Sequence, residues 1–420
     1  MLLGCIADDL TGATDLALML TRAGMRTVQV MQIPGKDSGL DGFDAVVVAL
    51  KTRTCPVGEA IDLSLKSADA LRALGARQLF FKYCSTFDST DQGNIGPVAE
   101  ALLARVNGAL AIACPAFPTN KRTVYMGNLF VGDVPLAESP MKDHPLTPMR
   151  DSNLVRVLQR QTKLPVGLIP FTVVDQGAAA IEKAFVAAAA EGKRFVIVDA
   201  ITDKHLLDMG TAAADMPLIT GGSGVALGLP GNFVRKGLMK SVAAPAKLEA
   251  PKGRAVIIAG SCSEATRGQV AAAKGAGIPA FEVDPFEIEK GQLSGTTLAG
   301  WARKQSADKP VLIYSSADPA AVRKVQDRLG RESAGAMIEQ TLADAAKALA
   351  SAGFTRMIIA GGETSGAVVN SLGVTALEIG PEIDPGVPWT RAVGRDLVLA
   401  LKSGNFGAPD FFLKAWDRLA

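Results

Sequence analysis

Apolar runs rich in valine, isoleucine and phenylalanine alternate along the chain with longer, alanine-rich segments of helical periodicity. The runs predict strands at residues 2–7, 26–31, 45–50, 78–82, 109–113, 195–199, 217–220, 255–259, 280–283, 311–314 and 356–360. Helices are predicted between them, for example over residues 14–23, 58–74, 98–106 and 178–190. This alternation is typical of an α/β fold with mostly parallel sheets and helices on both faces.

The alternation is interrupted at two places. Residues 243–253 are rich in alanine and proline and have no periodicity, which predicts a linker. We therefore expect two α/β domains, at residues 1–242 and 254–420. Residues 117–153 also lack clear periodicity, and a structureless segment of that length is usually an active-site loop or a lid.

Composition narrows the class of protein. The 420 residues include 44 basic and 42 acidic side chains, so the net charge of +2 gives no sign of a nucleic-acid or membrane partner. The five cysteines are widely spread without a C-x-x-C pair, which indicates free thiols in a reducing compartment. Residues 2–5 look like a lipoprotein cleavage box, but no leader precedes them and no apolar run could span a membrane. We expect a cytoplasmic protein, and a homo-oligomer is compatible with the sequence.

The first predicted strand runs directly into two carboxylates, Asp8 and Asp9, followed by Thr11 at the start of a predicted helix. Ligands of open α/β sheets bind beyond the carboxyl ends of the strands. One carboxylate there could act as a general base while its neighbour orients the substrate or a hydrated cation. Thr11 could donate a hydrogen bond to an anion. The alternative is that one aspartate only caps the helix.

Two further strand ends carry similar chemistry. The candidates are Lys51 and Arg53 after the strand at 45–50, and Lys82, Ser85, Thr86 and Asp88 after the strand at 78–81. Paired cations beside hydroxyls suit a carboxylate or a phosphate, although a solvated turn explains Lys51 and Arg53 equally well. Because three strand ends carry such groups, we expect one substrate-binding site there.

Cysteine and histidine add little to this site. Cys84 has no histidine near it in the sequence, so we do not expect a nucleophilic thiolate. No Cys/His cluster exists, and we assign no side chain as a metal ligand. His144, in the long loop, could contact the substrate or hold the loop, and His205 is expected on a surface helix without a role.

The second half contains two turns built from small residues, each between a predicted strand and a helix. Ser261 and Ser263 belong to the first, and the second comprises Gly361, Gly362, Glu363, Thr364, Ser365 and Gly366. Neither turn matches the P-loop pattern G-x-x-x-x-G-K-S/T or the dinucleotide pattern G-x-G-x-x-G. Helix N-termini with glycine turns attract phosphate through backbone N–H groups, so we predict a pocket for a polyphosphate. Glu363 could hold Mg²⁺ through water or cap the helix.

As a set, the motifs at residues 7–13, 82–90, 260–263 and 361–366 resemble those of the four-carbon acid sugar kinase family, over essentially the whole chain. The resemblance implies an N-terminal domain that binds a sugar acid and a C-terminal domain that binds ATP with Mg²⁺. It also implies that ATP contacts Ser261, the turn at 361–364 and Gly404. Residues 82–96 and 114–154 resemble members that act on an acid with a carbonyl at C3. Phe87 and Asp88 stand where the threonate and erythronate kinases have an arginine–glycine pair.

The implied reaction is in-line transfer of the γ-phosphoryl group of ATP to the C4 hydroxyl of a small sugar acid. Asp8 or Asp9 would be the base, and Lys51, Arg53 or Lys82 would anchor the substrate carboxylate. D-threonate and D-erythronate are alternative substrates. A nicotinamide-dependent dehydrogenase would need a G-x-G-x-x-G turn after the first strand, which the sequence lacks. A non-catalytic sugar-acid binder would not need paired aspartates.

Overall fold

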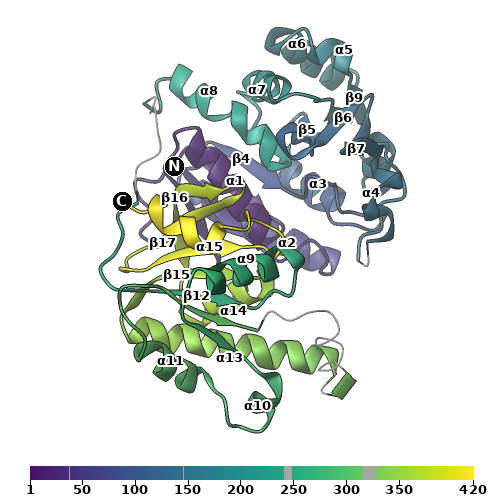
Figure 1. Cartoon of the computed structure of the whole chain (residues 1–420). Coiled ribbons are helices and arrows are strands. Elements are labelled where there is room, and N and C mark those ends of the chain that lie inside the picture. The colour runs from purple at the N-terminus through teal and green to yellow at the C-terminus, as the bar shows by residue number, and fades with distance from the viewer. Residues whose placement is uncertain (37, 145, 241–247, 316–326, 329) are drawn as a thin grey trace. The chain divides into compact units, whose positions relative to one another are not determined.

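The computed structural model describes residues 1–36, 38–144, 146–240, 248–315, 327–328 and 330–420. The chain divides into two compact units, Met1–Pro245 and Ala246–Ala420, and both contain parallel strands and helices (Figure 1). The predicted linker at 243–253 falls partly outside the described residues.

The first unit is built on parallel strands in the order β2-β3-β1-β4-β11-β5-β10-β9. The strands are β1 (Leu3–Ala7), β2 (Thr27–Val30), β3 (Ala45–Ala49), β4 (Gln78–Lys82), β5 (Ala111–Cys114), β9 (Val166–Ile169), β10 (Phe195–Val198) and β11 (Leu218–Gly221). The helices are α1 (Leu10–Arg22), α2 (Val57–Ala73), α3 (Ile95–Arg105), α4 (Leu154–Gln161), α5 (Phe171–Val174), α6 (Ala178–Ala190), α7 (Asp203–Ala212) and α8 (Pro230–Arg235).

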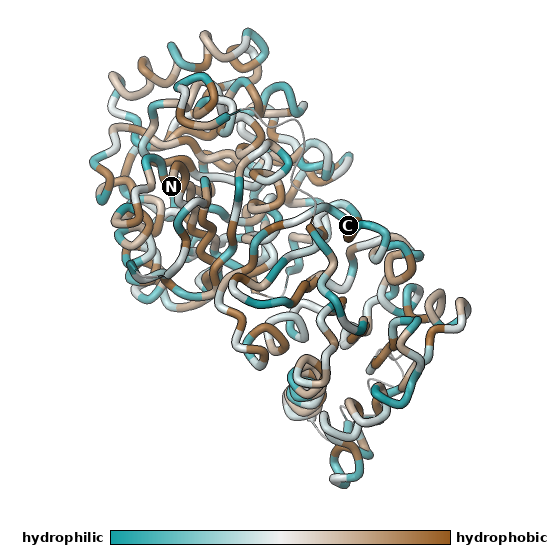
Figure 2. The backbone as a smooth tube through the Cα atoms, turned by 90° about the vertical axis from the view of Figure 1, so that its left-hand side faces the viewer, coloured by the Kyte–Doolittle hydropathy of each residue, from teal (hydrophilic) through white to brown (hydrophobic). Residues whose placement is uncertain are grey.

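The strands of this sheet are apolar on both faces because helices cover both. Every residue of β1 and β3 is buried, which explains why these strands read as continuous apolar runs rather than as alternating patterns. A Cβ atom added to Gly4 would lie 2.9 Å from the Cβ of Leu71 on α2, so glycine lets this helix pack closely on the sheet. Hydrophobic and hydrophilic stretches alternate along the backbone (Figure 2).

The segment at 117–153 contains a small antiparallel sheet, so the expectation of a structureless loop is wrong for residues 122–135. Its strands are β6 (Arg122–Tyr125), β7 (Asn128–Val131) and β8 (Val134–Pro135). Met126 and Gly127 both have positive φ, at 49° and 74°, which forms a two-residue hairpin turn. The buried Asp199 accepts hydrogen bonds from both of their backbone N–H groups, at 2.7 and 2.9 Å. A long-range contact that the sequence does not reveal therefore fixes the hairpin.

The second unit has the strand order β13-β14-β12-β15-β18-β17-β16. The strands are β12 (Arg254–Ala259), β13 (Ala280–Glu282), β14 (Val311–Tyr314), β15 (Phe354–Ala360), β16 (Ala376–Asp384), β17 (Val387–Ala392) and β18 (Val398–Lys402). The helices are α9 (Glu264–Gly275), α10 (Pro285–Glu289), α11 (Gly295–Arg303), α13 (Arg331–Ser351), α14 (Gly362–Ser371) and α15 (Phe411–Lys414). Strands β12 to β15 and β18 pair in parallel, whereas β17 is antiparallel to both β16 and β18.

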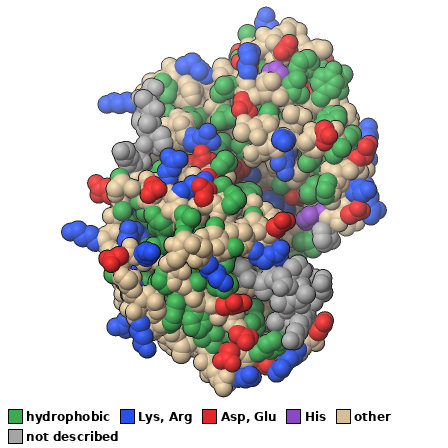
Figure 3. Space-filling view, viewed as in Figure 1, with side chains coloured by type: hydrophobic (Ala, Val, Ile, Leu, Met, Phe, Trp, Pro, Cys, Tyr) green, Lys and Arg blue, Asp and Glu red, His purple; other side chains and the backbone are tan. Residues whose placement is uncertain are grey.

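The predicted α/β class with mostly parallel sheets is confirmed. Among the described residues, no helix combines the length and the apolar character that crossing a bilayer requires. Charged side chains of both signs are interspersed over the face seen in Figure 3. This mixture agrees with the near-balanced count of basic and acidic residues.

Candidate active site

The topology of the first unit brings the N-terminal motifs to one edge of the sheet. Strand β1 pairs in parallel with β3 on one side and with β4 on the other, so the carboxyl ends of all three are adjacent. The chain leaves β1 towards β2 and β3 and then crosses to β4 on the opposite side. Such a reversal of strand order opens a crevice for a ligand. The residues that follow these strands begin with Asp8, Leu50 and Tyr83.

Asp8 and Arg53 form a bidentate ion pair at this edge. Arg53 Nε donates to Asp8 Oδ2 at 2.9 Å, and Nη2 donates to Oδ1 at 2.8 Å. Burial raises the pKa of the Asp8 carboxyl, and the Arg53 guanidinium opposes that shift. Burial would lower the pKa of Arg53, but the carboxylates of Asp8 and Asp9 outweigh it and raise that pKa. Both oxygens of Asp8 are thus occupied in holding Arg53 in place.

Asp9 combines the two roles considered from the sequence. It is the N-cap of α1, and its Oδ1 accepts a hydrogen bond from Gly12 N at 2.9 Å. The same oxygen lies 3.0 Å from Arg53 Nη2. Its Oδ2 has no hydrogen-bond partner among the described residues, and the side chain is 31% exposed. Asp9 therefore has one carboxylate oxygen free to accept a proton, next to the exposed side chain of Thr11.

The segment after β4 returns towards Arg53. Thr86 Oγ1 donates to Asp88 Oδ1 at 2.6 Å, and Asp88 Oδ2 lies 3.9 Å from Arg53 Nη1. Phe87, between them, has a φ of 52°, a backbone conformation that is rare and strained for an aromatic residue. Its buried ring meets that of Tyr83 edge to face, with the centroids 5.3 Å apart. Packing of Phe87 thus stabilises the turn that presents Thr86 and Asp88.

Three of the predicted substrate-binding residues, Lys82, Ser85 and Lys51, form no hydrogen bond or ion pair with Arg53 among the described residues. Lys82 is 3% exposed, and its ammonium donates to the backbone carbonyl of Tyr83 at 2.9 Å. Ser85 is half-buried in the turn before Thr86, and Lys51 is exposed. Lys51 follows β3 in the sequence, but its side chain forms no hydrogen bond or ion pair with Asp8, Arg53 or Asp88 among the described residues. Its role as a carboxylate anchor stays a prediction.

The thiol of Cys84 lies within this turn but is not activated. Burial, with the carboxylate of Asp88 nearby, raises the pKa of Cys84 to about 12. Its Sγ is hydrogen-bonded with Thr86 Oγ1 at 2.9 Å. A thiol with such a pKa stays protonated at neutral pH and is a poor nucleophile.

Sequence reasoning missed Asp15, Ser223 and Asn94. Asp15 lies on α1 one turn after Thr11 and accepts a hydrogen bond from the Ser223 hydroxyl. Burial raises the pKa of Asp15, and the ammonium of Lys82 opposes this shift. Asn94 Nδ2 donates to the carbonyls of Thr52 and Cys55, at 2.7 and 2.9 Å, and so holds the backbone around Arg53. The only available signal for Asp15 was a carboxylate within an otherwise apolar helix.

The site contains more carboxylates than cations. The carboxylates of Asp8, Asp9, Asp15 and Asp88 surround two buried or half-buried cations, Arg53 and Lys82. The guanidinium of Arg53 uses Nε and Nη2 for Asp8 and Asp9, whereas Nη1 has only the long contact to Asp88. Nη1 is therefore the part of the Arg53 guanidinium that remains available for an anionic ligand.

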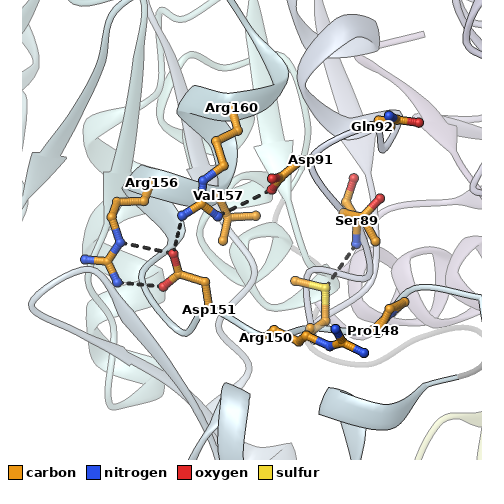
Figure 4. Close-up of a pocket in the computed structure, with 11 residues that line it drawn as sticks. Ser89, Asp91, Gln92, Pro148, Arg150, Asp151, Arg156, Val157 and Arg160 are labelled. Carbon is orange, nitrogen blue, oxygen red and sulfur yellow. Dashed lines mark hydrogen bonds and ion pairs between the residues drawn. The ribbon is translucent and has the colours of Figure 1, made fainter.

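A second pocket of the first unit lies between residues 89–92, residues 148–151 and helix α4 (Figure 4). Asp151 lies between Arg156 and Arg160, with contacts of 2.6 and 2.8 Å, and Arg160 also contacts Asp91 (Figure 4). Burial would raise the pKa of Asp151, but hydrogen bonds from both arginines and the Asn153 backbone hold it at about 2. Arg150 lies exposed at the edge of the pocket. The long loop, through Arg150, and helix α4, through Arg156 and Arg160, thus place cationic side chains next to the motif at 82–90.

The two histidines differ in their surroundings. His144 Nδ1 accepts from Thr147 N at 3.1 Å, which favours the alternative that this histidine holds the loop. His205 was expected on a surface helix without a role; Leu207 of the same helix, α7, is exposed, whereas the side chain of His205 itself is only 4% exposed. Its ring packs edge to face against Phe171, and its Nδ1 accepts from Ile201 N at 3.2 Å. His205 fills the space between α5 and α7.

In the second unit, three turns follow the neighbouring parallel strands β12, β15 and β18. Ser263 is the N-cap of α9 after β12, and its hydroxyl donates to the carbonyl of Gly404, after β18, at 2.6 Å. Gly361, after β15, donates its backbone N–H to the carbonyl of Lys402 at 2.9 Å. The turns that sequence and resemblance singled out therefore meet at one edge, where the N-termini of α9 and α14 lie.

Close packing explains the glycines of these turns. A Cβ on Gly404 would lie 2.2 Å from Ser261 Oγ, and Gly361 has a φ of 138° that other residues rarely adopt. Gly362, the first residue of α14, has open space around its Cβ position. Thr364 and Ser365 are buried, whereas Glu363 is exposed and Gly366 half-buried. The backbone N–H groups at the start of α14 are thus accessible to an anion near Gly362.

Known proteins match this arrangement over the whole chain. A family model described as a sugar-binding N-terminal domain matches residues 3–229, and one described as a nucleotide-binding C-terminal domain matches residues 256–412. A 3-oxo-tetronate kinase of Burkholderia multivorans is 54% identical over 99% of this chain and 96% of that protein. The chain belongs to the four-carbon acid sugar kinase family.

A second curated relative and a solved structure are also similar to this member of the four-carbon acid sugar kinase family over nearly their full lengths. A 3-oxo-tetronate kinase of Cupriavidus necator is 53% identical over 100% of this chain and 97% of that protein. A crystal structure from Salmonella typhimurium LT2 has a TM-score of 0.91 and 42% identity, and covers 100% of this chain and 99% of that one. The cluster around Asp9 lies within the part matched as sugar-binding, and the three glycine-containing turns lie within the part matched as nucleotide-binding.

Proposed function

We propose that this protein is an ATP-dependent kinase that phosphorylates the C4 hydroxyl of 3-oxo-tetronate. The observation that carries the proposal is the 54% identity, along 99% of the chain, to a protein named 3-oxo-tetronate kinase. Residues 1–242 would bind the sugar acid and residues 254–420 the nucleotide. Because ATP is the cosubstrate, we place the reaction in the cytoplasm.

Asp9 is the proposed general base. Its free Oδ2 can accept the proton of the C4 hydroxyl as the oxygen attacks phosphorus, while Oδ1 stays fixed by Gly12 N and Arg53. Asp8 would act as a positioning residue for Arg53, whose Nη1 would bind the substrate carboxylate. Thr11, Ser85, Thr86 and Asp88 would contact the remaining oxygens of the sugar acid. This division of roles favours Asp9 over Asp8 as the base, a choice that the sequence left open.

The nucleotide would bind at the three turns of the second unit. Backbone N–H groups at the starts of α9 and α14 suit the phosphates, with Gly362 leaving room for close approach. Mg²⁺ bound with ATP would neutralise phosphate charge. Glu363, at the start of α14, and Glu339 would be candidate oxygen donors to Mg²⁺. Burial and a side-chain hydrogen bond with Glu363 raise the pKa of Glu339, so the two carboxyls lie together. Water has to be excluded during the transfer, because it would compete with the C4 hydroxyl for the γ-phosphoryl group.

The direct test is ADP formation by the purified chain with ATP, Mg²⁺ and a panel of four-carbon acids. We expect ADP release that depends on 3-oxo-tetronate, and a phosphorus NMR signal of a phosphate ester at C4. The Asp9→Asn variant serves as the negative control. Reduction of NAD⁺ without ADP formation would instead support a dehydrogenase, and ADP release independent of any acid would contradict the proposal.

A further inference from the structure

Lys402 is a buried cation at the edge where the three turns of the second unit meet. It is the last residue of β18 and is only 2% exposed. Its ammonium donates to Thr266 Oγ1 at 3.0 Å and to the carbonyl of Gly404 at 3.3 Å. Its backbone carbonyl accepts from Gly361 N at 2.9 Å. One residue therefore contacts both the Gly361 turn and the Gly404 turn.

This ammonium has no anionic partner among the described residues. Burial alone lowers the pKa of Lys402 to about 8, with no carboxylate close enough to oppose it. The buried cations of the first unit differ, because Arg53 has two carboxylates in contact and Lys82 lies near Asp8 and Asp15. Burial of an uncompensated charge is unfavourable, so a buried lysine without a counter-ion indicates a functional constraint.

Hydrogen bonds within the protein do not explain why a lysine is buried at position 402. The carbonyl of Gly404 also accepts from Ser263 Oγ at 2.6 Å and from Thr266 Oγ1 at 2.8 Å. Both contacts would remain if the ammonium were removed, so no buried carbonyl would lose its only donor. The ammonium has three N–H groups, and two of them have acceptors among the described residues. One donor and the positive charge are left over.

We propose that Lys402 is the cation that binds the phosphates of ATP at the turn formed by Ser261, Ser263 and Gly404. The inference rests on the proposed nucleotide-binding function of the second unit. Lys402 takes the place that a lysine within the glycine turn has in P-loop proteins, but it comes from the neighbouring strand β18. The polyphosphate supplies the missing counter-ion, and Thr266 holds the ammonium in position before the nucleotide arrives.

The test compares Lys402→Met with the full-length parental chain. Calorimetric titration with ATP·Mg²⁺ should show an affinity about 10- to 100-fold weaker, as expected for the loss of a hydrogen bond from a charged group. The KM for ATP should rise, while the KM for the sugar acid stays within about twofold. The melting temperature without nucleotide should be unchanged or higher, because the variant removes an uncompensated buried charge.

Two further variants complete the design. Lys402→Gln keeps a hydrogen-bond donor without the positive charge and should also bind ATP·Mg²⁺ more weakly. If Lys402→Met does not fold, this variant tests the role of Lys402 in its place. Lys304→Met is the matched control, since Lys304 is exposed beside the amino end of β12, where Arg254 donates to the carbonyls of residues 302, 303, 305 and 306. It should bind ATP like the parental chain.

The outcomes separate this inference from the proposed function. If the parental chain binds no ATP·Mg²⁺, both fail. If the parental chain binds and both Lys402 variants bind within about threefold of it, the role of Lys402 is refuted and the kinase proposal stands. A lowered melting temperature with unchanged affinity would likewise assign Lys402 a structural role only.

Discussion

The substitution Gly12→Ala adds one methyl group at the centre of the proposed catalytic site. Its Cβ would lie 2.4 Å from Asp9 Oδ1 and 2.9 Å from Lys82 Nζ, so the carboxylate of Asp9 has to rotate away. Alanine favours a helix over glycine by about 1 kcal/mol. Loss of the Asp9 cap costs about 1 kcal/mol, and loss of the partly exposed contact with Arg53 costs up to about 1 kcal/mol more.

The expected net destabilisation is thus at most about 1 kcal/mol, which corresponds to a melting temperature lower by at most about 2–4 °C for a unit of this size. By contrast, kcat should fall about 100-fold or more, because the base is displaced. Gly58→Ala is the matched control, since Gly58 also lies in the first turn of a helix but has open space around its Cβ position. It should be slightly stabilising and leave kcat unchanged. Calorimetric melting and steady-state kinetics measure both variants, and a folded Gly12→Ala enzyme with kcat within threefold of the parental value would refute the role of Asp9.

Three further predictions follow from the same contacts. Asp9→Asn should keep the helix cap and lower kcat by about 10² or more, whereas Asp8→Asn should mainly raise the KM for the acid by releasing Arg53; equal parental kcat in both variants at saturating substrate would show that neither is the base. Gly362→Val should fold but abolish calorimetric binding of ATP·Mg²⁺, because its side chain would occupy the open space at the start of α14; unimpaired binding would place the phosphates elsewhere. Cys84→Ser should retain kcat within about threefold, since a thiol with a pKa of about 12 is not a nucleophile; a loss of 10³ would contradict this.

The α/β class could be predicted from sequence because buried parallel strands are continuous apolar runs. The residues at strand ends could be identified for the same reason, since a polar residue after such a run ends the strand. The antiparallel strands β16 and β17 escaped prediction, because charged residues such as Glu378, Glu382 and Arg391 interrupt their apolar character. Strand β9 was missed because Gly167 interrupts a short run.

Partners within the site could not be predicted, because they depend on strand order. Asp8 and Arg53 are 45 residues apart, and only the parallel pairing of β1 with β3 brings them into contact. Asp15 lies within the mostly apolar helix α1, and Lys402 ends the apolar strand β18. In the sequence each is only an isolated charged residue, so neither could be assigned to a site. The strained turn at Phe87 is equally invisible, since it results from packing against Tyr83.

A comparison of kcat/KM values tests most directly whether this kinase is specific for an acid with a carbonyl at C3. ADP formation should be measured with 3-oxo-tetronate, D-threonate and D-erythronate under identical conditions. A pocket built around one arrangement of hydrogen-bonding groups can discriminate by orders of magnitude against another. We predict that kcat/KM for 3-oxo-tetronate exceeds both other values by about 10² or more. Equal or higher values for D-threonate or D-erythronate would contradict the assignment.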